Sequence, residues 1–221
     1  MSNTISSLFR PANSVCWNVF LALVPIALGW VLSRIIRQSR RIGNLQLLWS
    51  IPVGAVWLLF LPNTCYLLSE WRHYLTPISA TPIIYRAQHD HGALFALLAS
   101  TLFYVTYSGT GMISFVLSIW PVEHAIRSRG NFLLWPYKVV FFWLCSLGVY
   151  LGLVKRSNSW DIFTSERASE LLRFTKDAFT RPELFLVITA FGLVLWCTYW
   201  SFDIWVDGFQ HRFGRARSTV N

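Results

Sequence analysis

Five long apolar runs, separated by more polar segments, set the pattern of the chain. They cover residues 15–32, 45–61, 93–120, 132–154 and 184–206. A helix rises 1.5 Å per residue and the hydrocarbon core of a bilayer is about 30 Å thick, so each run is long enough to cross it or nearly so. The pattern therefore predicts an all-α, polytopic bundle of about five transmembrane helices, forming a single integral membrane domain over residues 1–221.

Prolines interrupt the first two runs. Pro25 lies inside the first run, Pro52 lies inside the second, and Pro62 follows directly after the second. A proline removes one backbone donor, and inside a membrane the freed carbonyl must be satisfied by neighbouring helices or side chains. We therefore expect kinked helices that are held by their neighbours.

The composition agrees with a membrane protein. Of the 221 residues, 54% are hydrophobic and 13% are charged, which is more apolar surface than a soluble core of this length could hide. The net charge of +9 would suggest nucleic-acid binding in a soluble protein. Here the basic residues lie in segments beside the apolar runs, where they orient a protein in the membrane. We expect the lipid bilayer as partner and no nucleic acid.

The distribution of arginines predicts an orientation. Arg34, Arg37, Arg40 and Arg41 follow the first run, whereas Arg10 alone precedes it. Basic segments favour the cytoplasmic side, and the first helix usually dominates this choice, so the N-terminus is expected outside and the C-terminus in the cytoplasm. Six basic residues between positions 155 and 181 oppose this orientation. An amphipathic helix on the outer interface, whose basic residues would attract anionic lipid head groups, would account for them. Such a helix is indicated by the stretch "WDIFTSERASELLRFTKDAFTRP".

A polar stripe follows the second run. In "FLPNTCYLLSEWRHYL", Asn63, Tyr66, Glu70 and His73 are spaced by three, four and three residues. In a helix these four side chains fall within an arc of roughly 80°. The stripe is a candidate binding or catalytic site, although the asparagine is equally suited to capping a helix end.

Two long segments between the runs should meet on the same side of the membrane. With five helices in alternation, residues 63–92 and 155–182 both lie on the outer side. The first segment adds His89, Asp90 and His91, and the second adds further polar residues, namely Arg156, Asn158, Trp160 and Asp161. A few convergent polar groups above an apolar wall are typical of a small-molecule pocket, so we expect one at the outer interface.

Glu70 and His73 allow three chemical interpretations. Their i, i+3 spacing is that of the Glu-x-x-His pairs in carboxylate-bridged metal sites, and His89, His91, Asp90 or Asp161 would supply a further ligand to a divalent metal. Without a metal, the carboxylate would orient the imidazole for acid–base catalysis. The third interpretation is an interfacial helix in which both side chains bond to neighbours such as Arg72 or Arg86. The spacing alone leaves all three open.

The third and later runs carry polar residues of their own. Small and hydroxyl-bearing residues form one face of the third run, which favours close helix packing over a transport pathway: Ser100, Tyr104, Tyr107, Ser108, Gly111 and Ser114. Lys138 and Asp203 are the charges inside the fourth and fifth runs, at a similar depth. Because an isolated charge there is unfavourable, we expect these two residues to pair.

Three stretches resemble the signatures of an uncharacterised bacterial membrane family, known as domain of unknown function 1361. They are "WNVFLALVP", "FLPNTCYLLSEWRHYL" and "YLGLVKRSNSWDIF". In the second stretch Glu70 stands where the family usually has Asp, and in the third Ser157 replaces a Trp. The resemblance implies a bacterial inner-membrane protein and brings no activity with it.

Three classes of function follow. The first is an enzyme that acts on a lipid-linked or anionic substrate, with Glu70 and His73 as the reactive pair. The second is a non-catalytic assembly or accessory protein, in which the same residues form a structural network. The third is a small-solute transporter, for which an ionisable group near the middle of the membrane would be expected.

Overall fold

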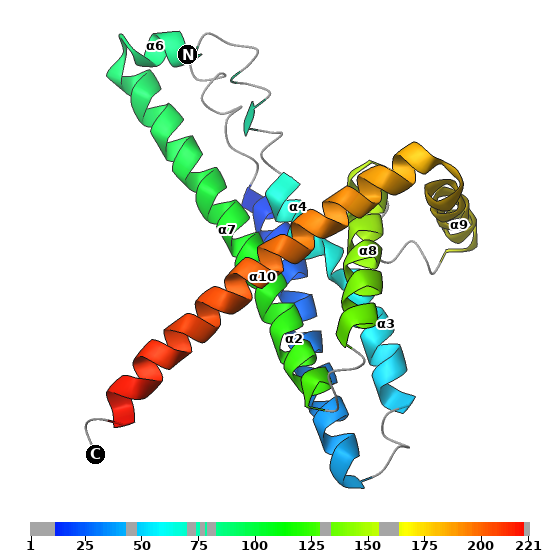
Figure 1. Cartoon of the computed structure of the whole chain (residues 1–221). Coiled ribbons are helices and arrows are strands. Elements are labelled where there is room, and N and C mark those ends of the chain that lie inside the picture. Colours follow the sequence, from blue (N-terminus) through cyan, green and yellow to red (C-terminus); the bar gives the residue numbers. More distant parts are fainter. Residues whose placement is uncertain are drawn as a thin grey trace.

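The computed structural model describes residues 12–42, 48–69, 74–75, 78, 83–128, 134–154 and 164–218. These residues contain no β-strand. Their helices, labelled in Figure 1, are α2 (Ala12–Ile42), α3 (Ser50–Phe60), α4 (Pro62–Ser69), α6 (Ile83–Ala87), α7 (His91–Arg127), α8 (Leu134–Leu153), α9 (Ser165–Thr180) and α10 (Pro182–Ser218). The predicted all-α class is confirmed.

Each predicted apolar run overlaps a helix. Among the residues that the structure describes, four segments are long and apolar enough to cross a membrane, namely Ser14–Ser39, Ser50–Leu67, His91–Arg127 and Pro182–Val206. The shorter apolar segment Tyr137–Leu153 lies in α8. The amphipathic helix expected after the fourth run is α9, which buries Ala178 against Leu147 and Ile188.

The second run extends further than the sequence pattern predicts. Its apolar stretch ends at Leu61, yet the chain stays helical through α4 to Ser69. The break at Pro62 is bridged by side chains: Asn63 Nδ2 donates to the Phe60 carbonyl at 2.9 Å, and Thr64 Oγ1 donates to the Leu61 carbonyl at 2.8 Å. Phe60 and Leu61 lie at the end of α3, where the last carbonyls of a helix have no partner within it. The two bonds satisfy these carbonyls, and the chain continues as a helix.

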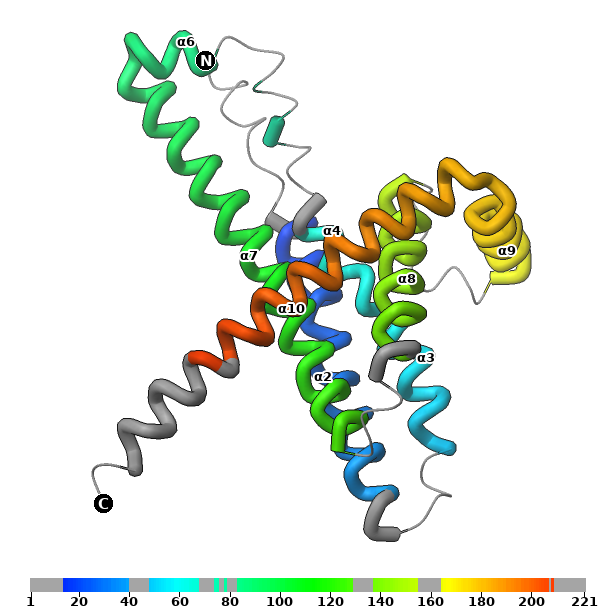
Figure 2. Tube along the Cα trace, viewed as in Figure 1, coloured from blue at the N-terminus to red at the C-terminus, as the bar shows by residue number. Residues whose placement is uncertain are grey.

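Helices α2 and α7 form the centre of the bundle, with α3 and α4 on one side and α8 and α10 on another. Figure 1 shows that α2 and α7 run in one direction, whereas α3, α4 and α8 run in the other. Figure 2 shows α10 crossing the bundle obliquely over α7 and α8, with both of which it is in contact. As a result, α4 and α8 end at the same end of the bundle, where α7 and α10 begin.

The small-residue face of α7 is buried, as the sequence predicts. All six of its residues, from Ser100 to Ser114, are buried within the bundle. At Gly111 a β-carbon would overlap Leu67 and the Thr64 carbonyl of α4, so only glycine permits this approach of the two helices. Ser118, about two turns beyond Gly111 in α7, donates to the Pro25 carbonyl of α2 at 2.8 Å and accepts from Trp57 Nε1 at 2.8 Å.

Candidate functional site

The first half of the polar stripe lies inside the bundle. Asn63 is buried in α4, where its amide bonds to the Phe60 carbonyl. The hydroxyl of Tyr66, one turn later, donates to the Gly148 carbonyl of α8 at 3.2 Å. Glu70 and His73 lie outside the described residues.

The Tyr66 ring fixes α4 against α8. A β-carbon at Gly152 would overlap the Tyr66 ring, and one at Gly148 would overlap Pro62. Two glycines spaced by one helical turn therefore let α8 approach α4 closely. Four predicted site residues, which come shortly after α8, lie outside the described residues: Arg156, Asn158, Trp160 and Asp161. The two helices that lead into the two halves of the predicted site are in direct contact.

The residues before the third run lie at the start of α7 and are exposed. Asp90 is the N-cap of α7, and its Oδ1 accepts from the Gly92 amide at 2.8 Å. The ring of His89 lies 5.1 Å from that of Tyr85, measured between centroids. His91 is the first residue of α7. Within the described residues, no three His, Cys, Asp or Glu side chains gather closely enough to hold a metal ion.

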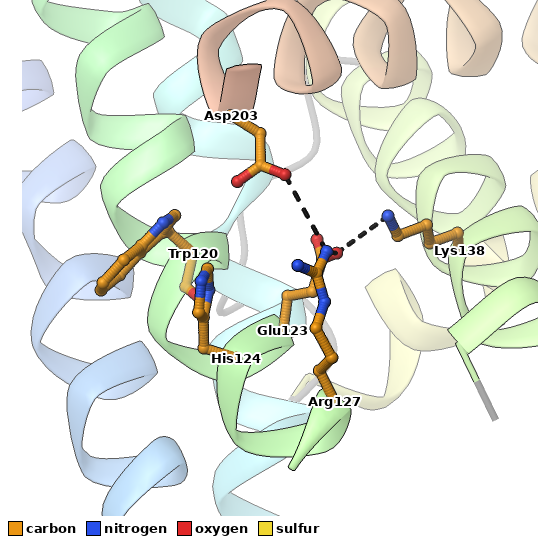
Figure 3. Close-up of polar contacts among 6 residues, drawn as sticks. All are labelled: Trp120, Glu123, His124, Arg127, Lys138 and Asp203. Atoms are coloured by element: carbon orange, nitrogen blue, oxygen red, sulfur yellow. Dashed lines mark hydrogen bonds and ion pairs between the residues drawn. The ribbon is translucent and has the colours of Figure 1, made fainter. Parts of the chain in front are cut away.

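A cluster of charged side chains, which the sequence pattern did not reveal, lies near the opposite end of the bundle. We call Glu123 and Arg127 of α7, Lys138 of α8 and Asp203 of α10 the charge cluster (Figure 3). Glu123 Oε1 lies 2.8 Å from Lys138 Nζ and 2.9 Å from Arg127 Nη2. Arg127 Nη2 is in turn 4.0 Å from Asp203 Oδ2.

Burial differs strongly across the charge cluster. The side chain of Glu123 is only 1% exposed, that of Lys138 is 17% exposed, and that of Arg127 is 42% exposed. Tyr199 of α10, which is also buried, adjoins the Glu123 carboxylate. On the other side of α7, the rings of His124 and Trp120 lie 4.2 Å apart. One buried carboxylate thus holds cations from two helices, and the arginine extends the contact to α10.

The expected pairing of Lys138 with Asp203 is not the one that the structure contains. Lys138 forms its ion pair with Glu123, while Asp203 is next to Arg127. The predicted third run ended at Trp120, before Glu123, whereas α7 continues as a helix to Arg127. The signal that could have revealed the cluster is the i, i+4 spacing of Glu123 and Arg127, which places both on one helical face.

The chemistry of the charge cluster favours a structural role. Two carboxylates are matched by two cations, so the group carries no excess charge. Buried ion pairs of this kind fix the arrangement of the elements that carry them, because removing one partner leaves a charge unpaired in a medium of low dielectric constant. The charge cluster therefore ties α8 and α10 to α7.

A comparison with known protein families finds one match for this chain. The family model described as "Protein of unknown function (DUF1361)" matches residues 17–198. No curated protein and no solved structure matches the chain.

Proposed function

The chain belongs to the DUF1361 family of proteins of unknown function, and from this membership we propose that it is a multi-pass protein of a bacterial inner membrane with a polar site at the outer interface. At that site it acts on an anionic, lipid-linked substrate. The N-terminus lies outside and the C-terminus lies in the cytoplasm.

The exposed surface of the helices supports membrane insertion. Phe95 and Leu102 of α7, and Leu186 and Trp205 of α10, are each more than 60% exposed. Such large apolar side chains on long helices are unfavourable in water and suit a lipid environment. The apolar face of α9, with Leu172 and Phe179 exposed, suits the boundary between head groups and acyl chains.

One contact carries the proposal of a common site, namely Tyr66 against Gly148 and Gly152. The stripe residues Glu70 and His73 come directly after α4, and Arg156 comes two residues after the last described residue that follows α8. Because Tyr66 holds α4 against α8, both segments leave the bundle from neighbouring helices at the same end. This neighbourhood favours a site shared by the two segments.

The proposed chemistry uses residues from both segments. Glu70 and His73 act as an acid–base pair, or as ligands of a divalent metal together with His89 or His91. Arg156 binds the anionic group of the substrate, because a guanidinium offers several donors to a phosphate or carboxylate. Asn63, Tyr66, Asn158, Trp160 and Asp161 line the site.

Turnover of a lipid would test this function. The purified full chain is reconstituted into vesicles made from a bacterial lipid extract, and lipid species are compared by mass spectrometry before and after incubation. We expect at least one species to change with the wild-type protein and to stay constant with Glu70→Gln or His73→Asn. Glu166→Gln, an exposed site on α9, is the matched control and should behave like the wild type. Equal lipid profiles for the wild type and empty vesicles would contradict the proposal.

Metal analysis of the same preparations distinguishes the metal-binding role of Glu70 and His73 from the acid–base role. If Glu70 and His73 bind a metal, Glu70→Ala should remove it from the purified protein, because too few ligands remain. Equal metal content in the wild type and in Glu70→Ala would rule out the metal-binding role and leave only the acid–base role.

A non-catalytic assembly role is the second candidate, and the bonding of Asn63 and Tyr66 favours it. Both side chains bond to backbone carbonyls of the bundle, which is what structural polar groups do. In that case Tyr66→Phe should lower the melting temperature, and the wild-type protein itself should leave every lipid species unchanged.

A further inference from the structure

A cleft opens between α3 and α8, near the end of the bundle that holds the charge cluster. Its volume is about 320 Å³, and it is partly open to the exterior. The walls come from four helices and include Leu32 and Ile36 of α2, Gly54 of α3, Val122 of α7, and Val140 and Leu144 of α8.

The packing of the helices explains why the cleft exists. Helix α3 packs mainly on α2, whereas α8 packs mainly on α4 and α10, and an open space remains between α3 and α8. Trp57 and Phe141, stacked with ring centroids 5.2 Å apart, line its deeper part. Gly54 has no side chain, so α3 leaves space open at this point of the cleft. A β-carbon there would meet only Leu32, at 3.8 Å.

Tyr137 adds an aromatic ring to the wall of the cleft. Its side chain lines the cleft, but its hydroxyl oxygen is buried and is not exposed to the open space. The other lining residues are mostly apolar. An apolar chain, such as the acyl chain of a lipid, therefore suits the cleft.

The end of α2 beside the cleft is positively charged. Arg37 directly follows the lining residue Ile36, and Arg34 comes two residues before it; both are exposed and form no ion pair within the described part of the chain. Arg40 and Arg41 follow in the same helix. A ligand with an apolar tail and an anionic head would therefore find partners for both ends.

We propose that this cleft binds one anionic phospholipid, with an acyl chain between α3 and α8 and the phosphate at the positively charged end of α2. This site is separate from the proposed outer site, and it requires only that the chain lies in a membrane.

Lipid binding to the delipidated full chain in detergent would test the proposal. Native mass spectrometry counts bound phosphatidylglycerol, with phosphatidylcholine as the neutral comparison. We expect one tight site that prefers phosphatidylglycerol. Gly54→Leu adds a side chain to the wall of the cleft, at a position where the β-carbon meets only Leu32, and should weaken that site by about tenfold. Gly109→Leu makes the same change at a glycine of α7 with no neighbour within 4 Å, and it should bind like the wild type.

Two further variants test the polar contacts and leave the volume of the cleft intact. Arg34→Gln combined with Arg37→Gln should abolish the preference for phosphatidylglycerol. Arg86→Gln changes an exposed arginine of α6, which lies at the opposite end of the bundle (Figure 1), and should preserve the preference.

The proposal is wrong if Gly54→Leu and Gly109→Leu bind phosphatidylglycerol equally. It is also wrong if Gly54→Leu converts a dimer of the chain to a monomer, because the cleft would then receive a second copy. Should Gly54→Leu fail to fold by circular dichroism, unchanged lipid preference in the double arginine variant would still overturn the proposal. If the turnover experiment on the proposed outer site fails, the lipid-binding measurements described here are unaffected, because they test a different site.

Discussion

Glu123 places a carboxylate where three helices meet, and its two cations lie at different distances from solvent. Lys138 is nearly buried, whereas Arg127 is more than one-third exposed and can reach water or lipid head groups. If the carboxylate is lost, Arg127 can therefore relax outward, but Lys138 stays in the apolar interior. The free energy of the charge cluster thus depends mainly on the contact between Glu123 and Lys138.

Replacing Glu123 by glutamine should destabilise the protein by about 3 kcal/mol, because it leaves the Lys138 ammonium buried without a counter-charge. Unfolding in mixed detergent micelles, followed by circular dichroism, measures this change. Glu170→Gln on the exposed face of α9 is the matched control and should stay within about 0.5 kcal/mol of the wild type. A melting curve of Glu123→Gln that coincides with that of the control would show that the charge cluster adds nothing to stability.

Lys138→Met combined with Glu123→Leu removes the central pair as a whole. We expect this double variant to be more stable than Glu123→Gln alone, because no unpaired ammonium remains and apolar side chains suit the site. The comparison uses the same unfolding measurement. If the double variant is less stable than Glu123→Gln, the attraction between Glu123 and Lys138 itself stabilises the protein, beyond the avoidance of an unpaired charge.

At the scale of helices, close contacts hold the centre of the bundle. Gly29 of α2 lies against the Ser118 carbonyl of α7, and a β-carbon there would overlap that backbone atom. Because backbone cannot move aside as a flexible side chain can, any larger residue must push α2 away from α7. The bonds from Ser118 to Pro25 and from Trp57 to Ser118 depend on the same approach.

Gly29→Ala should therefore destabilise the bundle by about 1–3 kcal/mol, since overpacking separates the two helices. Gly109→Ala, in α7, introduces the same methyl group into open space and should be neutral or stabilising by up to about 1 kcal/mol through helix propensity. Both values come from unfolding in mixed micelles. Equal stability of the two variants would contradict the packing that we describe.

At the scale of the whole molecule, the two ends of the bundle are distinct. One end has the ends of α4 and α8 and the start of α7, and the other has the charge cluster and the arginines of α2. Helix α7 has 37 residues, which corresponds to about 55 Å and exceeds the thickness of the hydrocarbon core. Its two ends should therefore reach water on opposite sides of a membrane.

Cysteine labelling of intact cells would establish the orientation. In a chain whose exposed cysteines Cys16 and Cys197 are changed to alanine, Gln88→Cys and Ser128→Cys place single thiols before and after α7. We expect a membrane-impermeant maleimide to label Gln88→Cys and to label Ser128→Cys only after the cells are lysed. The reverse pattern would invert the proposed orientation, and equal labelling of both would contradict a membrane-spanning α7.

The sequence by itself determined the helical class, the five apolar segments and the packing face of α7. These properties depend on local features: the length of apolar runs, which must match the thickness of a bilayer, and the spacing of small residues at helical periodicity. The amphipathic pattern of α9 is of the same kind. Glu70, His73 and the segment with Arg156 remain sequence predictions, because they lie outside the described residues.

Only the tertiary structure decided which polar groups meet. Lys138 and Asp203 share a depth, but rotation of α8 and α10 about their axes places Glu123 and Arg127 of α7 as their partners. The helix continues past Pro62 because Asn63 and Thr64 bond to the carbonyls of Phe60 and Leu61. The cleft between α3 and α8 exists because these two helices pack mainly on other helices. Partners and cavities arise between segments that are distant in the chain, and helical periodicity gives the face of each residue but not the helix that it meets.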